Sequence, residues 1–178
     1  MTVLGAIFAG GRASRFGSDK AAAEIEGTAM LDHVVARLAP QCDALVIVGR
    51  EWPPLPSIAD RPRPGLGPLG ALAGALGHAH EHGHDAVLTS GCDLPDLPGD
   101  LIARLSPAPA VLRGQPLVGL WDAALYPLLL AHLDRDADRS MRGWIEHVGA
   151  RRIEPPHPLA NINTPRDLER FQQARNRY

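Results

Sequence analysis

The chain has 178 residues, of which 45% are hydrophobic and 21% are charged, and its formal net charge at pH 7 is −2. We expect a single domain over residues 1–178, because a chain of this length can bury a sizeable core. The composition is typical of a soluble globular protein, and the small net charge argues against a general nucleic-acid binder.

Cysteine content and the N-terminus bear on localisation. Cys42 and Cys92 are too few for a disulfide scaffold and fit a reducing cytosol. The N-terminus lacks the charged segment and cleavage site of a signal peptide, and no apolar run approaches the length of a membrane span. We therefore expect a cytoplasmic protein with neither a membrane nor a nucleic-acid partner.

Apolar runs of strand length alternate along the chain with segments of helical spacing. Strands are predicted at 3–8, 44–48, 57–59, 86–91, 110–112 (an edge strand) and 116–121. Helices are predicted at about 30–38, 69–80, 99–105, 125–133 and 140–147 and from 165 onward, with residues 21–27 as a short connection. This alternation predicts βαβ units and therefore a three-layer α/β fold, a mostly parallel sheet with helices on both faces.

The first strand runs directly into a glycine-rich loop, residues 9–20, whose cations are Arg12, Arg15 and Lys20. Gly10 and Gly11 allow close backbone approach, so that main-chain N–H groups can turn toward an anion. We interpret the loop as a polyphosphate site; the alternative is an ordinary turn with solvated cations. Its spacing excludes both the P-loop, G-x-x-x-x-G-K-[ST], and the dinucleotide fingerprint, G-x-G-x-x-G.

Acidic side chains follow two other predicted strands, Asp60 after 57–59 and Asp93 after 86–91. Ligands of parallel sheets bind beyond the carboxyl ends of the strands, so we expect the glycine-rich loop, Asp60 and Asp93 to share one cleft. Asp93 is the candidate metal ligand, because Mg²⁺ takes one or two carboxylates and completes its shell with phosphates and water. The alternative is that Asp93 caps a helix or turn. Cys92 is interpreted as a small buried residue, since the neighbouring carboxylate disfavours its thiolate.

Three further patterns have both a functional and a structural interpretation. Asn161 and Asn163 precede a predicted helix and could complete a Mg²⁺ shell or hold substrate phosphate, or Asn163 could simply end a turn. The histidines at 78, 80, 82 and 84 are interpreted as the end of a helix, where protonated histidine suits the helix dipole, rather than as a metal site. Gly70, Gly74 and Gly77 let another surface approach the helix at 69–80, which we interpret as a tight contact with the sheet or a ligand; ordinary close packing explains them equally well.

Together these motifs resemble the molybdenum cofactor guanylyltransferases, the MobA family of nucleotidyltransferases. Residues 8–20 keep the spacing of the family's L-A-G-G-x-x-S-R-M-G-x-D-K loop. Residues 67–70 are similar to its G-P-L-A/G element, 92–95 to its C-D-x-P and 161–165 to its N-x-N-T-P. The four matches come in family order and span nearly the whole chain.

The resemblance implies a Rossmann-like nucleotidyltransferase fold and Mg²⁺-dependent transfer of GMP from GTP to the terminal phosphate of molybdopterin, with release of pyrophosphate. It also implies that any protein partners belong to cofactor biosynthesis or molybdoenzyme maturation.

The resemblance further assigns roles to individual residues. Phe8, Ala9 and Gly10 would contact guanine or ribose through their backbone, and Asp60 matches an acidic position on the nucleoside side. Asp93 would bind Mg²⁺ and GTP. Mg²⁺ held by Asp93 would neutralise charge at the phosphates, together with the catalytic cations Lys20 and Arg15 and the amides of Gly10 and Gly11.

The sequence departs from the family pattern in four places, and alternatives remain. Phe8 and Phe16 replace the usual Leu and Met, Gly49 stands where some members have Asn, and Gln115-Pro116 stands where His-Pro is common. The nearest alternatives are a cytidylyltransferase on molybdopterin and a nucleotidyltransferase for another phosphorylated acceptor. A non-enzymatic nucleotide-binding regulator is disfavoured by the intact lysine and aspartate. An NAD-dependent oxidoreductase is disfavoured by the missing fingerprint.

Overall fold

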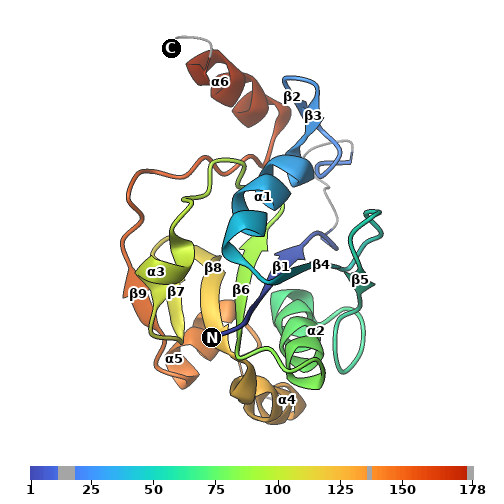
Figure 1. Ribbon diagram of the computed structural model, residues 1–178, viewed down its shortest axis with the longest axis vertical. Coiled ribbons are helices and arrows are strands. Elements are labelled where there is room, and N and C mark those ends of the chain that lie inside the picture. The colour runs from blue at the N-terminus through green and yellow to red at the C-terminus, as the bar shows by residue number, and fades with distance from the viewer. Residues whose placement is uncertain (12–18, 136–137, 176–178) are drawn as a thin grey trace.

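The computed structural model describes residues 1–11, 19–135 and 138–175 (Figure 1). The strands of its main sheet are β1 (Val3–Phe8), β4 (Ala44–Val48), β5 (Ser57–Ile58), β6 (Ala86–Gly91), β7 (Ala110–Leu112), β8 (Gln115–Asp122) and β9 (Arg151–Ile153). The helices are α1 (Met30–Leu38), α2 (Gly67–Glu81), α3 (Leu101–Leu105), α4 (Tyr126–Asp134), α5 (Met141–His147) and α6 (Pro165–Arg175). Short 3₁₀ turns cover Ala39–Gln41 and Ala123–Leu125.

The main sheet has the strand order β5-β4-β1-β6-β8-β7-β9. Strands β5, β4, β1 and β6 pair in parallel, as do β7 and β9, whereas β8 is antiparallel to both β6 and β7. The predicted mostly parallel sheet is therefore confirmed. The prediction that 110–112 is an edge strand is wrong, because β9 pairs with β7 on its outer side and takes the edge itself.

Two apolar cores flank the sheet and make the three layers. On one face Leu72 and Leu76 of α2 pack with Leu129 of α4 and with the fully buried Trp121 and Trp144. The core on the other face is formed largely by α1 and α3, with Leu31, Val34, Leu38, Leu101 and Leu105. The carboxyl ends of β1, β4, β5 and β6 remain between these helical layers, and this edge is where the site was predicted.

The glycines of α2 mark a close contact, as predicted. A Cβ on Gly74 would lie 2.3 Å from the carbonyl oxygen of Ala59, and one on Gly70 would lie 3.2 Å from Oδ2 of Asp60. The surface that approaches the helix is thus the segment directly after β5. This contact holds Asp60 beside the N-terminal half of α2.

Residues 21–29 form more than the predicted short connection. They contain a small antiparallel ladder, β2 (Glu24–Ile25) with β3 (Thr28–Ala29). Helix α6 lies beside this ladder (Figure 1), where Phe171 packs near the buried Ile25, and Arg175 forms an ion pair with Glu26. The C-terminal segment is thereby attached to the chain just after the glycine-rich loop.

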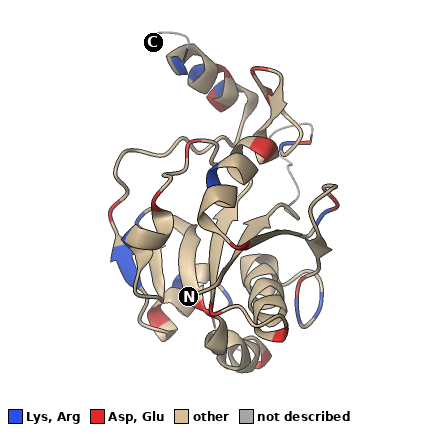
Figure 2. Ribbon diagram, in the orientation of Figure 1, with Lys and Arg blue, Asp and Glu red and all other residues tan. Residues whose placement is uncertain are grey.

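Charged residues are scattered over the fold, with two neighbouring arginines on β9 (Figure 2). Within the described part of the chain, none of the helices has the length and apolar character needed to span a bilayer.

Candidate active site

A hollow of about 1160 Å³ opens at the carboxyl ends of the parallel strands. Its lining includes residues 8–11 after β1, Asp60 after β5 and Asp93 after β6, together with Lys20 and Asn163. The expectation that the glycine-rich loop, Asp60 and Asp93 share one cleft is therefore met by the described residues. Arg15, Arg12 and Phe16 lie outside the described residues.

Lys20 is at the centre of the polar contacts in this cavity. Its Nζ donates to Oδ2 of Asp93 at 3.0 Å and to Oδ1 of Asn163 at 2.7 Å. The side chains of Lys20 and Asp93 are only 16% and 21% exposed, so the ion pair is largely screened from solvent. An ammonium group has three N–H donors, and these two contacts leave one for a further acceptor such as a phosphate oxygen.

Lys20 is also the only lysine in the chain; the rest of its 18 lysines and arginines are arginine. Lysine offers a compact point charge on a flexible stem, whereas arginine offers a wider planar fork. The one position where the chain uses the smaller cation is thus the position that faces the cavity and an aspartate.

Asp93 is held in the cavity by its backbone and by a neighbouring glycine. Its carbonyl oxygen accepts the N–H of Ile162 at 3.0 Å, which ties the C-terminal segment to the end of β6. A Cβ on Gly91 would lie 2.6 Å from Oδ1 of Asp93, so only glycine leaves room for this carboxylate. Oδ2 contacts Lys20, and Oδ1 accepts no hydrogen bond from the described residues.

The two asparagines differ in their placement. Asn163 lines the cavity, whereas Asn161 is exposed and instead accepts from Nδ2 of Asn163 at 2.8 Å, which fixes the amide that faces Lys20. The segment is anchored on both sides: the N–H of Ala160 donates to Asp96, and Asp167 accepts from the N–H groups of Asn163 and Thr164. Asn161 therefore contributes to the cavity by orienting the amide of Asn163.

Gly49 allows the glycine-rich loop to pass close to the end of β4. Gly49 has φ +87°, and a Cβ built on it would lie 2.7 Å from Cα of Gly10. The Asn that some family members have here does not fit this close contact between two backbones.

We expect Gly49→Ala to lower the free energy of unfolding by about 1–3 kcal/mol, because alanine is strained at positive φ and also meets Gly10. Urea unfolding measures this, with Gly114→Ala as the control. Gly114 also has positive φ, but a Cβ there meets nothing within 4 Å. Equal losses in the two variants would contradict a role for the contact with Gly10.

Asp60 lies in the cavity without a partner among the described residues. Partial burial raises the pKa of its carboxyl group above the ordinary value. A carboxyl group with a raised pKa in the folded state favours folding most when it is protonated, and this contribution is lost as the pH rises through the folded-state pKa. At neutral pH the charged Asp60 therefore costs stability, which is typical of a residue kept for binding.

We expect Asp60→Asn to raise the melting temperature of the ligand-free protein at pH 7, and the gain to vanish below about pH 3.9, where the carboxyl group is protonated in both states. The same variant should bind a nucleoside triphosphate more weakly. Thermal unfolding at a series of pH values measures the first effect and calorimetric titration the second. A variant that is less stable than the wild type at pH 7 would contradict this account.

Cys92 lines the cavity, whereas the histidine run lies where α2 ends. Burial, with a further contribution from Asp93, raises the pKa of Cys92 to about 11, so the thiolate is disfavoured as predicted. The rings of His78 and His82 stack at 4.0 Å where α2 ends. Within the described residues, no three histidine, cysteine, aspartate or glutamate side chains lie close enough together to hold a metal ion by themselves.

Asp19 and Arg50 also line the cavity. Asp19 is the aspartate of the family's loop motif but was given no role, and Arg50 belongs to none of the motifs. Arg50 follows the predicted strand at 44–48, whose carboxyl end lies at this edge of the sheet. Its position after a strand could therefore have indicated that it belongs to the site.

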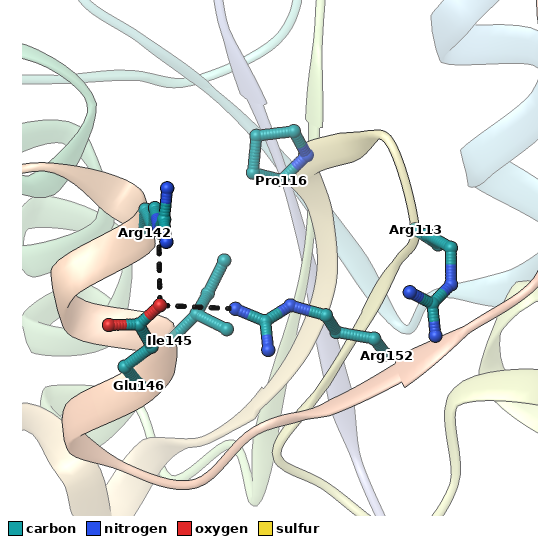
Figure 3. Close-up of a pocket in the computed structure, with 6 residues that line it drawn as sticks. All are labelled: Arg113, Pro116, Arg142, Ile145, Glu146 and Arg152. Carbon is teal, nitrogen blue, oxygen red and sulfur yellow. Dashed lines mark hydrogen bonds and ion pairs between the residues drawn. The ribbon is translucent and has the colours of Figure 1, made fainter.

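A second, smaller hollow of about 420 Å³ lies between α5, β9 and the turn before β8 (Figure 3). Its three arginines are paired with carboxylates: Arg142 and Arg152 both contact Glu146, at 3.1 and 3.8 Å, and Arg113 contacts Glu154. These ion pairs offset most of its positive charge. Pro116, which keeps the proline of the family's His-Pro pair and follows the divergent Gln115, is part of its wall.

Comparison with known proteins shows the family of this chain. Residues 5–154 match the family described as the MobA-like NTP transferase domain. The chain belongs to this family. A molybdenum cofactor guanylyltransferase of Rhodobacter capsulatus is 36% identical over 97% of this chain and 96% of its own length. One of Sinorhizobium fredii is 36% identical over 96% of this chain and 91% of its own.

Solved structures confirm the fold of this MobA-like chain. Molybdopterin-guanine dinucleotide biosynthesis protein A of Archaeoglobus fulgidus superposes with a TM-score of 0.73 at 18% identity, covering 98% of this chain and all of the other. A nucleotidyl transferase of Methanothermobacter superposes with a TM-score of 0.72 at 19% identity, covering 99% and 98% of the two chains. The expected Rossmann-like nucleotidyltransferase fold is therefore confirmed.

Proposed function

We propose that this protein transfers GMP from GTP to the terminal phosphate of molybdopterin, releasing pyrophosphate and giving the guanine dinucleotide form of the cofactor. The observation that carries the proposal is the contact of the single lysine with Asp93 and Asn163 inside the cavity. It is supported by membership of the MobA-like family and by close relatives that are named molybdenum cofactor guanylyltransferases.

Transfer of this kind needs no protein nucleophile. An oxygen of the acceptor phosphate attacks the α-phosphorus of GTP, the new P–O bond forms, and the bond to the β-phosphate oxygen breaks, so that pyrophosphate leaves. Negative charge builds up on the α-phosphate oxygens and on the leaving group, so stabilisation of that charge and positioning carry most of the catalysis. The raised pKa of Cys92 is consistent with a mechanism that uses no thiolate.

The donor groups at the end of β6 fit a Mg²⁺ ion. Asp93 presents a carboxylate oxygen that no described residue occupies, Gly91 leaves room for it, and amide oxygens lie nearby. Mg²⁺ usually takes one or two carboxylates together with substrate phosphates and water, so a single aspartate is enough. When bound, the ion would neutralise phosphate charge as a Lewis acid.

The chain's own residues would then act as follows. Lys20 donates its remaining N–H to a phosphate oxygen while Asn163 keeps its ammonium in place. The amides of Gly10 and Gly11 would donate to the phosphates. The backbone of Phe8 and Ala9 would contact the guanosine, and Asp60 would lie at the nucleoside end of the nucleotide. Arg15 adds a further charge. Asn161 orients Asn163.

An assay of nucleotide and acceptor tests the function directly. Purified protein is incubated with Mg²⁺, molybdopterin and GTP, CTP or ATP, and pyrophosphate release and the dinucleotide product are measured. We expect product with GTP and little with the others. Product with CTP instead would assign the cytidylyl activity, and nucleotide binding without pyrophosphate release would indicate a regulator.

A further inference from the structure

An ion pair between Asp19 and Arg50 forms part of the cavity lining. The two residues are 31 positions apart, and the guanidinium donates two parallel hydrogen bonds, Nη1 to Oδ1 at 2.7 Å and Nη2 to Oδ2 at 2.5 Å. Such a bidentate pair fixes orientation as well as distance. It joins the end of β4 to the residue directly before Lys20.

Arg50 makes two further contacts on its own side of this pair. Its carbonyl oxygen accepts from Oγ of Ser57 at 2.7 Å, and its guanidinium lies 5.2 Å from the centre of the Trp52 ring. Trp52 in turn donates from Nε1 to Asp32 of α1 at 2.7 Å. The backbone of Arg50 is thus anchored to β5, and its guanidinium lies against a ring that is itself hydrogen-bonded to α1.

Asp19 passes this constraint to the backbone around Lys20. Oδ1 of Asp19 also accepts a hydrogen bond from the N–H of Ala21 at 3.2 Å. This bond connects the two residues that flank Lys20 in the sequence. The carbonyl oxygen of Ala21 then accepts from Leu31 at the start of α1. With the backbone of Lys20 fixed, its flexible stem has to search less space to place Nζ between Asp93 and Asn163.

We propose that Arg50 is a positioning residue for the transfer reaction, acting through Asp19 to hold Lys20 in the cavity. The expected effect of Arg50 on the rate of GMP transfer rests on the function proposed above. Its expected effect on the position of Lys20 does not. The hydrogen bond from Arg50 lowers the pKa of Asp19 below its ordinary value, as expected for a carboxylate held by a guanidinium. Because both side chains are partly exposed, at 26% and 49%, the pair adds little to global stability.

The kinetic test compares Arg50→Gln, Asp19→Asn and the double variant. Each single change should lower kcat about tenfold, and the double variant should lose no more than the singles, because both remove the same link. The KM for GTP should stay within about twofold. Glu81→Gln is the matched control: Glu81 is also 49% exposed and accepts a bidentate pair, from Arg61, but it lies outside the cavity lining. It should behave as wild type.

The kinetic results that overturn the proposal are distinct. Multiplied losses in the double variant, or a raised KM with unchanged kcat for Arg50→Gln alone, would mean that Arg50 contacts the nucleotide itself. Unchanged kinetics in both single variants would mean that the pair has no part in the reaction.

The single lysine supplies a readout that needs no activity. Incorporation of ¹³C-lysine gives one side-chain set of NMR signals, all from Lys20. Arg50→Gln and Asp19→Asn should both move the ε-methylene signal to the same new position, while Glu81→Gln should leave it unchanged. If the wild type fails to transfer GMP, the proposed function is lost, yet this experiment still decides the positioning role. An unmoved signal in both variants would refute it.

Discussion

Replacing Asp93 by alanine should lower kcat/KM for GMP transfer by about 100- to 1000-fold, or roughly 3–4 kcal/mol of transition-state stabilisation. The change removes the carboxylate proposed to hold Mg²⁺ and leaves the Lys20 ammonium with Asn163 as its one side-chain partner among the described residues. Steady-state kinetics over a range of Mg²⁺ concentrations measure the loss, which added Mg²⁺ should not restore.

The fold should survive this change. The backbone carbonyl of Asp93 still accepts from the N–H of Ile162 after the change. Asp100→Asn is the control, because Asp100 pairs with Arg104 outside the cavity lining and should keep full activity. An Asp93→Ala protein with wild-type turnover and unchanged Mg²⁺ dependence would remove the metal role from this residue.

The second large effect is expected at Lys20. Lys20→Met keeps the length of the stem and removes the charge, and we expect a fall in kcat of about 100-fold, because the lost charge acts mainly on the transition state. Lys20→Arg should recover only part of this rate, since a planar guanidinium cannot place a compact charge between Asp93 and Asn163. Pre-steady-state measurement of pyrophosphate release separates the chemical step from product release.

The two Lys20 variants also show whether the reaction needs any positive charge at this position or specifically the contacts that lysine makes. If Lys20→Arg matches the wild type, any cation is sufficient and the specific contacts with Asp93 and Asn163 are not needed. If Lys20→Met retains full kcat but binds GTP weakly, Lys20 serves ground-state binding alone. Either result would contradict the proposed role in the transition state.

Most of the sheet was predictable, because its central strands are rich in apolar residues that are mostly buried. The run at 44–48 and the run at 86–91 have this character and form β4 and β6 with the predicted bounds. β9 was not recognised as a strand, since two of its three residues are arginines, and β7 was therefore placed at the edge. The ladder of β2 and β3 has two residues in each strand, too few for any period to show.

The predicted part of the site depends on one topological rule. The carboxyl ends of parallel strands meet at one edge, so Asp60, Asp93 and the loop after β1 could be placed together from the order of the elements. Asn163 reaches the cavity because its segment is tied to the backbone of Asp93, and no strand rule describes that link. The pairing of Arg50 with Asp19 depends on side-chain geometry across 31 residues, which spacing along the chain does not encode.

The most direct test of the account is a crystal structure with Mn²⁺, in place of Mg²⁺, and a non-hydrolysable GTP analogue, in which anomalous scattering locates the metal. The account predicts a metal peak within about 2.0–2.2 Å of a carboxylate oxygen of Asp93, with Nζ of Lys20 hydrogen-bonded to a phosphate oxygen of the same nucleotide. A triphosphate bound in the cavity with its metal held elsewhere and Lys20 turned away from it would contradict the account.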